Sequence, residues 1–161
     1  MGIEQLNKLT LIPAQAIISN NPLEILDPPA GKTALMYACC NYTQDGIEIV
    51  NLLLAKGVNP LKRDKNQATA IMYAIANKNI ANAKAITDIL LKCGIDINAI
   101  DYRNETALIR AVQSPFRDCA VIQHLIDKGA NTSLLNCEGY TALQIAKKYK
   151  YKNAVELLEK Y

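Results

Sequence analysis

The sequence Thr-Ala-Leu-Ile-Arg-Ala at residues 106–111 is one copy of the pattern that decides the fold, Thr-Ala-Leu/Ile-x-x-Ala. The pattern occurs four times, beginning at Thr33, Thr69, Thr106 and Thr141, so the intervals are 36, 37 and 35 residues. Self-similarity at a period of roughly 20–50 residues indicates a protein built from stacked repeats, in which each unit buries its apolar face against its neighbours.

A second motif keeps a constant distance from the next copy of the first. An apolar pair is followed by two further residues and then by glycine, at Leu53-Leu54 with Gly57, Leu90-Leu91 with Gly94, and Leu125-Ile126 with Gly129. Each glycine precedes the next threonine by 12 residues, whereas the distance from a threonine to the following glycine varies from 23 to 25. The constant segment predicts a rigid connector, and the variable segment predicts a loop that tolerates insertions.

Each unit has the local features of two helices. The threonine hydroxyl can accept a hydrogen bond from the free amides of a first helical turn. Leu108, Ala111 and Val112 then fall on one face at helical spacing, and Gly94 suits the left-handed conformation that ends a helix. The segments from glycine to threonine carry Asn and Asp at turn positions, which favour an extended, hairpin-like finger.

The same spacing predicts a further repeat at the N-terminus. Asn21 lies 12 residues before Thr33, and Ile17-Ile18 take the place of the apolar pair. We therefore expect an all-α solenoid of about five stacked antiparallel helix pairs in one domain, residues 1–161. Helices are expected over residues 3–9, 13–20, 33–41, 46–56, 69–78, 81–93, 106–114, 119–128, 141–149 and 152–160. The expected repeats are a degenerate N-terminal cap (1–30), three internal repeats (31–65, 66–102 and 103–137) and a C-terminal cap (138–161).

These motifs resemble the ankyrin repeat, whose signature is Thr-Pro-Leu-His-x-Ala. The resemblance covers residues 31–161, and it is specific because two motifs recur in the same phase. The departures are Ala34, Ala70, Ala107 and Ala142 at the family's proline, and Met36, Met72, Ile109 and Gln144 at its histidine. Alanine is a good helix former, so we expect the fold to be kept. The second departure removes a side chain that makes hydrogen bonds between repeats in the family.

Composition agrees with one folded domain. Half of the residues are apolar and 20% are charged, unlike a disordered chain. No apolar run approaches the ~20 residues that a membrane-spanning helix needs, and the first 12 residues lack a secretory signal. The net charge of +3 is too small to indicate nucleic-acid binding. We expect a monomeric, cytoplasmic protein without a membrane partner.

Few side chains could carry chemistry. The five cysteines are odd in number and lack the spacing of a zinc site, so we interpret them as reduced thiols that pack as small apolar residues. His124 is the only histidine, which leaves one possible base for any Cys–His or Ser–His pair. Gly31-Lys32-Thr33 resembles the end of a phosphate-binding loop, but Leu26 stands where that loop needs glycine. We predict no catalysis, no cofactor and no metal site.

The ankyrin resemblance implies a non-catalytic module that binds another protein through the concave surface of the fingers and first helices. The family's phase gives these partner-binding candidates: Lys65, Asn66, Tyr102, Arg103, Glu105, Glu138 and Tyr140 in the fingers, and Met36, Met72, Asn77 and Gln113 on the first helices. It also directs Lys32 and Lys148 toward this surface. Tyr102 and Arg103 come first, since interfaces favour a central tyrosine or arginine anchor.

Three alternatives stay open from the sequence. The chain could be an interaction or regulatory domain of a larger enzyme or assembly. The basic C-terminal stretch, residues 147–152 (Lys-Lys-Tyr-Lys-Tyr-Lys), could bind nucleic acid or an acidic surface weakly, although we favour its interpretation as the solvated face of a terminal repeat. The Asn-, Ile- and Lys-rich composition also favours an AT-rich genome, bacterial or protozoan. A bacterial protein that acts on host partners in the host cytosol is therefore a further hypothesis.

Overall fold

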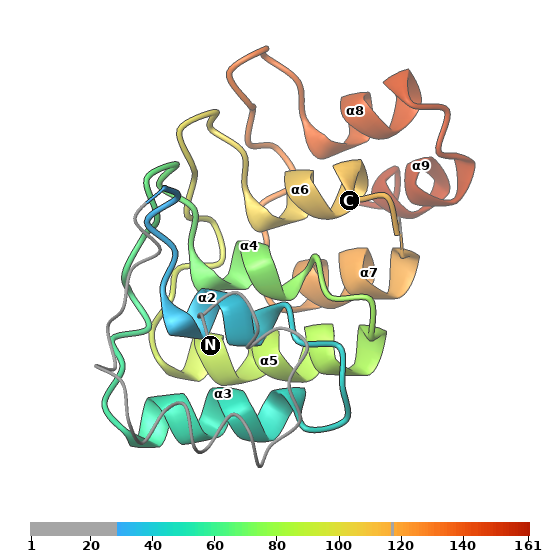
Figure 1. Ribbon diagram of the computed structural model, residues 1–161. Coiled ribbons are helices and arrows are strands. Elements are labelled where there is room, and N and C mark those ends of the chain that lie inside the picture. Colours follow the sequence, from blue (N-terminus) through green and yellow to red (C-terminus); the bar gives the residue numbers. More distant parts are fainter. Residues whose placement is uncertain (1–28, 117) are drawn as a thin grey trace. The chain divides into compact units, whose positions relative to one another are not determined.

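The computed structural model describes residues 29–116 and 118–161, and the regular secondary structure in these ranges is helical throughout (Figure 1). The helices are α2 (Ala34–Cys39), α3 (Gly46–Ala55), α4 (Ala70–Ala74), α5 (Ile80–Lys92), α6 (Ala107–Gln113), α7 (Cys119–Asp127), α8 (Ala142–Lys148) and α9 (Lys152–Leu158). They confirm the predicted all-α fold. The helices expected over 3–9 and 13–20 lie outside the described residues. In the described ranges, no helix has both the length and the apolar character needed to cross a membrane.

The chain divides into two compact units, the first ending at Ile95 and the second comprising Asp96–Tyr161. In the first unit α2 contacts α3 and α4, while α5 contacts α3 and α4. In the second unit α6 contacts α7 and α8, while α9 contacts α7 and α8. Each unit therefore holds two consecutive helix pairs, with first helices beside first helices and second helices beside second helices (Figure 1).

The threonines begin the first helix of every pair, but they do not all cap it in the same way. The hydroxyls of Thr33, Thr106 and Thr141 accept a hydrogen bond from the backbone amide three residues later, as predicted. Thr69 makes no side-chain cap. The prediction is wrong there because the Met72 amide donates to the backbone carbonyl of Thr69 instead.

The three motif glycines all have left-handed backbone conformations at helix ends. Gly57, Gly94 and Gly129 have φ angles of 83°, 86° and 92°. After α5, the amides of Gly94 and Ile95 donate to the carbonyls of Leu91 and Leu90, respectively. These bonds satisfy carbonyls that a helix end would otherwise leave open. The predicted role of Gly94 is confirmed.

We expect Gly94→Val to lower the free energy of unfolding by about 1–2 kcal/mol or more, measured by urea denaturation. A Cβ atom at this position would meet no atom within 4 Å, so the loss comes from backbone strain rather than from a clash. Gly94→Asn is the control, because asparagine tolerates the left-handed region better than valine. Equal midpoints for the valine variant and the wild type would contradict this account. The companion prediction, that Asn21→Gly is neutral or slightly stabilising, lies outside the described residues.

Candidate functional site

A buried side-chain oxygen organises the turn of each finger. Asp101 is 3% exposed, and its Oδ1 accepts hydrogen bonds from the amides of Arg103 (2.7 Å) and Glu105 (2.9 Å). Asn104 takes up a positive φ of 55° inside this turn. The other described fingers repeat the pattern: Asp64 accepts from the amides of Asn66 and Ala68, and Asn136 accepts from those of Glu138 and Tyr140. The turn is therefore held by residues that face inward, which leaves those between them to face outward.

In the two fingers with an aspartate, the second carboxylate oxygen of Asp64 or Asp101 bonds to the first helix that follows the finger. Asp64 Oδ2 accepts a hydrogen bond of 2.6 Å from the Tyr73 hydroxyl on α4. Asp101 Oδ2 pairs with the Arg110 guanidinium on α6, through Nε at 3.0 Å and also through Nη2. The sequence pattern predicted the Asn and Asp residues of the fingers, Asp64 and Asp101 among them, as turn residues but did not predict this second bond. The equal spacing of nine residues to Tyr73 and to Arg110 is the signal that could have shown it.

In the first unit, three of the predicted contact residues are interior. Met36 and Met72 are 0% and 2% exposed, respectively, and Asn77 is 3% exposed. The Asn77 amide donates to the carbonyls of Cys39 (3.0 Å) and Asn41 (2.7 Å), one repeat earlier. The expectation that these three side chains face a partner is wrong, because burying an apolar methionine or satisfying two buried carbonyls stabilises the fold. Lys65 and Asn66 are exposed on the finger, as expected.

In the second unit, the tip of the finger is exposed and its base is buried. Tyr102 is 64% exposed, and the side chain of Arg103 is 43% exposed. Glu105 is only 5% exposed, so its side chain is structural rather than a free contact. Gln113 donates to Glu105 Oε1 at 3.1 Å, and Arg110 Nε lies 3.7 Å from its Oε2. Glu105 and Gln113 thus join the base of the finger to α6.

Glu138 connects this finger to the next first helix. Its Oε1 lies 3.3 Å from Arg103 Nη2, and its Oε2 lies 3.3 Å from Lys148 Nζ. The Cys137 amide donates to the Arg103 carbonyl at 2.8 Å, which joins the two adjacent fingers. The half-buried Tyr140 ring lies under Lys148, with its centroid 4.6 Å from Nζ. The surface in this unit therefore combines two cations, one carboxylate and two tyrosines.

The charges of this surface shift two pKa values upward. The pKa of Arg103 is raised, chiefly by the negative charge of Glu105 and next by a hydrogen bond with Cys137. The pKa of Lys148 is raised because its ammonium donates a hydrogen bond to Glu138 and is attracted by the same carboxylate. Both side chains stay positively charged at neutral pH. The pairs of Glu138 with Arg103 and with Lys148 are solvent-exposed, so they contribute little to the stability of the fold.

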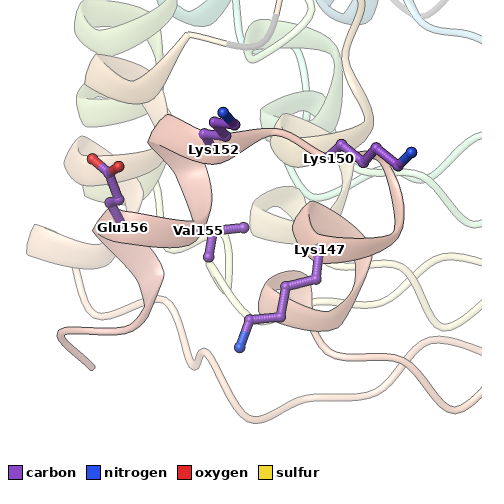
Figure 2. Close-up of a pocket in the computed structure, with 5 residues that line it drawn as sticks. All are labelled: Lys147, Lys150, Lys152, Val155 and Glu156. Carbon is purple, nitrogen blue, oxygen red and sulfur yellow. The ribbon is translucent and has the colours of Figure 1, made fainter.

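The basic C-terminal stretch lines a shallow cavity of about 270 Å³, together with Val155 and Glu156 (Figure 2). The ammonium groups of Lys147, Lys150 and Lys152 point away from one another rather than toward a common point. Lys147 Nζ also lies 2.8 Å from Glu159. An anion-binding site would need the three ammonium groups to converge on one point. This basic face is therefore less suited to binding a ligand than the fingers are.

The cysteines do not form a metal site in the part of the chain that the structure describes. They are free thiols, and the described residues hold no group of three or more His, Cys, Asp or Glu that could bind a metal ion. Burial raises the pKa of Cys39, and burial also raises the pKa of Cys40 from 9.0 to about 11. Cys137 is exposed on the finger.

We expect iodoacetamide at pH 8 to alkylate Cys137 first and to leave Cys39 and Cys40 unmodified, as read by peptide mass spectrometry. Cys39 is inaccessible, and a pKa near 11 makes the reactive thiolate of Cys40 about a hundredfold rarer than a pKa of 9.0 would. Alkylation of Cys40 should rise as the pH is raised toward 11. Equal rates for Cys40 and Cys137 at pH 8 would contradict the burial described here.

Comparisons with known proteins agree with the repeat architecture. The family model for ankyrin repeats (3 copies) matches residues 5–101 and 80–161. Regulatory protein NPR1 of Arabidopsis thaliana is 36% identical over 103 residues, which are 64% of this chain and 16% of the relative. Alpha-latrotoxin-Lg1a of Latrodectus geometricus is 28% identical over 120 residues, 73% of this chain and 8% of the relative. E3 ubiquitin-protein ligase KEG of Arabidopsis thaliana is 25% identical over 120 residues, 73% of this chain and 7% of the relative. The chain thus spans 16% or less of the length of each of these three relatives.

Proposed function

Because this chain belongs to the ankyrin-repeat family, we propose that it is a non-catalytic module that binds another protein through its fingers. Ankyrin repeats are general protein–protein interaction modules. The observation that carries the proposal for this chain is the exposure of Tyr102 on a finger whose flanking residues, Asp101 and Glu105, are buried. The fold holds the turn in place while the tyrosine ring stays in solvent.

Tyr102 and Arg103 are the side chains that we expect to contribute most to binding. Tyrosine and arginine are enriched among the residues that dominate interface energies. A tyrosine on a fixed turn presents a large contact area with few rotatable bonds, so ordering it on binding costs little entropy. Glu138 and Tyr140 complete the proposed surface in the second unit, and Lys65 and Asn66 belong to it in the first.

The experiment is a display selection with the full chain immobilised, followed by a counter-screen on two variants. The finger variant is Tyr102→Ala with Arg103→Ala, and the control variant is Lys150→Ala with Lys152→Ala on the terminal repeat. We expect most selected ligands to lose binding to the finger variant and to keep binding to the control. Ligands that lose the control and keep the finger variant would identify the basic terminal face as the site and overturn the proposal.

A further inference from the structure

The charged side chains that reach solvent on the proposed surface are mainly cationic. The carboxylates of Asp64, Asp101 and Glu105 are 3%, 3% and 5% exposed, respectively, and they are engaged by turn amides or by neighbouring side chains. At the positions that the repeat phase directs toward this surface, the solvent-reaching cations are Lys32 and Lys65 in the first unit and Arg103 and Lys148 in the second. Glu138 is the one solvent-reaching carboxylate among those positions in the described residues.

In each unit, tyrosine rings hold one of these ammonium groups in place. Lys32 Nζ lies 5.5 Å from the ring centroid of Tyr37 and 5.2 Å from that of Tyr73. Lys148 Nζ lies 4.6 Å from the centroid of Tyr140. An aromatic face attracts a cation through its quadrupole and carries no net charge of its own. The rings therefore restrict the position of each ammonium group without adding a negative charge that would neutralise it.

In the second unit, Glu138 shows how a carboxylate fits between these cations. One of its oxygens is directed to Arg103 and the other to Lys148, at 3.3 Å each. All three side chains are about half exposed to solvent, at 43%, 45% and 51% for Arg103, Glu138 and Lys148. A carboxylate from a partner can therefore reach the same two cations from the solvent side and replace Glu138.

We propose that the finger surface of each unit recognises acidic side chains, so that the partner presents a segment rich in Asp and Glu. This inference rests on the proposed function and adds the chemistry of the partner. A polypeptide fits better than a nucleic acid, because each unit by itself presents only two of these cations. A phosphate backbone is instead followed by a continuous basic groove.

The test is fluorescence anisotropy with a labelled peptide of Asp, Glu and Gly. Its Asn/Gln counterpart and a single-stranded DNA of equal charge serve as comparison probes. Lys32→Gln and Lys148→Gln are expected to weaken binding of the acidic peptide about threefold or more each, as for a lost charged contact. Lys92→Gln on α5 and Lys152→Gln on α9 remove the same charge elsewhere and are expected to change the affinity less. Circular dichroism checks that every variant is folded.

Glu138→Gln provides a test of opposite sign. Removing the carboxylate that competes for Arg103 and Lys148 should tighten binding of the acidic peptide about threefold. Glu156→Gln on α9 makes the same change in net charge and should tighten it less. A difference between these two variants separates a local site from general attraction by a positively charged protein.

Any of four outcomes would overturn the inference. They are equal binding of the acidic peptide and its amide counterpart, equal effects of surface and control lysines, equal effects of Glu138→Gln and Glu156→Gln, and tighter binding of the DNA than of the peptide. Rejection of the acidic partner can be distinguished from rejection of binding through the fingers. If display ligands depend on Tyr102 and Arg103 but not on acidic side chains, the finger surface stands and only the acidic partner is rejected.

Discussion

Asp101→Ala is expected to lower the free energy of unfolding by about 3–5 kcal/mol, which makes it the most destabilising single change described here. The buried carboxylate accepts the amides of Arg103 and Glu105 and pairs with the guanidinium of Arg110. Alanine would leave two turn amides without their acceptor and would remove the nearer of the two carboxylates that pair with Arg110, whose side chain is only 27% exposed. Urea denaturation followed by circular dichroism measures the loss.

Asp101→Asn is the matched control, because the chain itself uses an amide at the equivalent position. Asn136 Oδ1 accepts hydrogen bonds from the two corresponding turn amides of its own finger, those of Glu138 and Tyr140, at 3.0 Å each. We expect this variant to keep the turn and to lose mainly the pairing with Arg110, so its destabilisation should be clearly smaller than that of the alanine variant. If the alanine and asparagine variants unfold at the same urea concentration, the turn bonds are not what stabilises the finger.

Tyr102→Ala together with Arg103→Ala is expected to weaken the binding of a finger-dependent ligand about thirtyfold or more. The melting temperature should stay nearly unchanged, because Tyr102 is 64% exposed and the Arg103–Glu138 pair is solvent-exposed. The buried Glu105 carboxylate loses Arg103 but keeps Gln113 and Arg110 as partners. Calorimetric titration gives the affinity, and thermal denaturation gives the stability.

Lys150→Ala with Lys152→Ala is the control pair for that measurement, and it should change the affinity little. The cavity beside these lysines has diverging ammonium groups, so it offers no convergent contact for a ligand. A large drop in melting temperature for the Tyr102 and Arg103 pair would mean that the side chains support the fold. In that case a loss of affinity could not be assigned to lost contacts.

The helices could be predicted closely because their signals are local. Capping threonines, apolar spacing and terminal glycines lie within a few residues of the structure that they determine, and α5 and α7 fall within a residue of the expected bounds. The expected helix over 69–78 is the main difference, since α4 ends at Ala74. There the amides of Ala76 and Asn77 bond to carbonyls three residues earlier, which tightens the chain out of the α-helical pattern.

The candidate surface could be predicted only in part, because side-chain burial depends on contacts between repeats. The turn chemistry of the fingers is local, so the exposure of Tyr102 and Lys65 followed from the sequence. Asn77 instead satisfies carbonyls 36 and 38 residues away, and no local pattern shows that. The burial of Met36 and Met72 is likewise decided by neighbouring elements rather than by their own helix.

In each finger, the residues that form the turn differ from the residues that face a partner. Evolution can therefore replace the second set while it keeps the first. The shape depends on an inward oxygen at residue 101 and on main-chain amides, which every non-proline residue supplies. Residues 102 and 103 can therefore be exchanged while the turn persists, and the same holds for 65 and 66 and for 137 and 138. Point mutations at these six positions can therefore change the binding specificity without a prior increase in the stability of the fold. For the same reason, a protein engineer can randomise the six codons in a library.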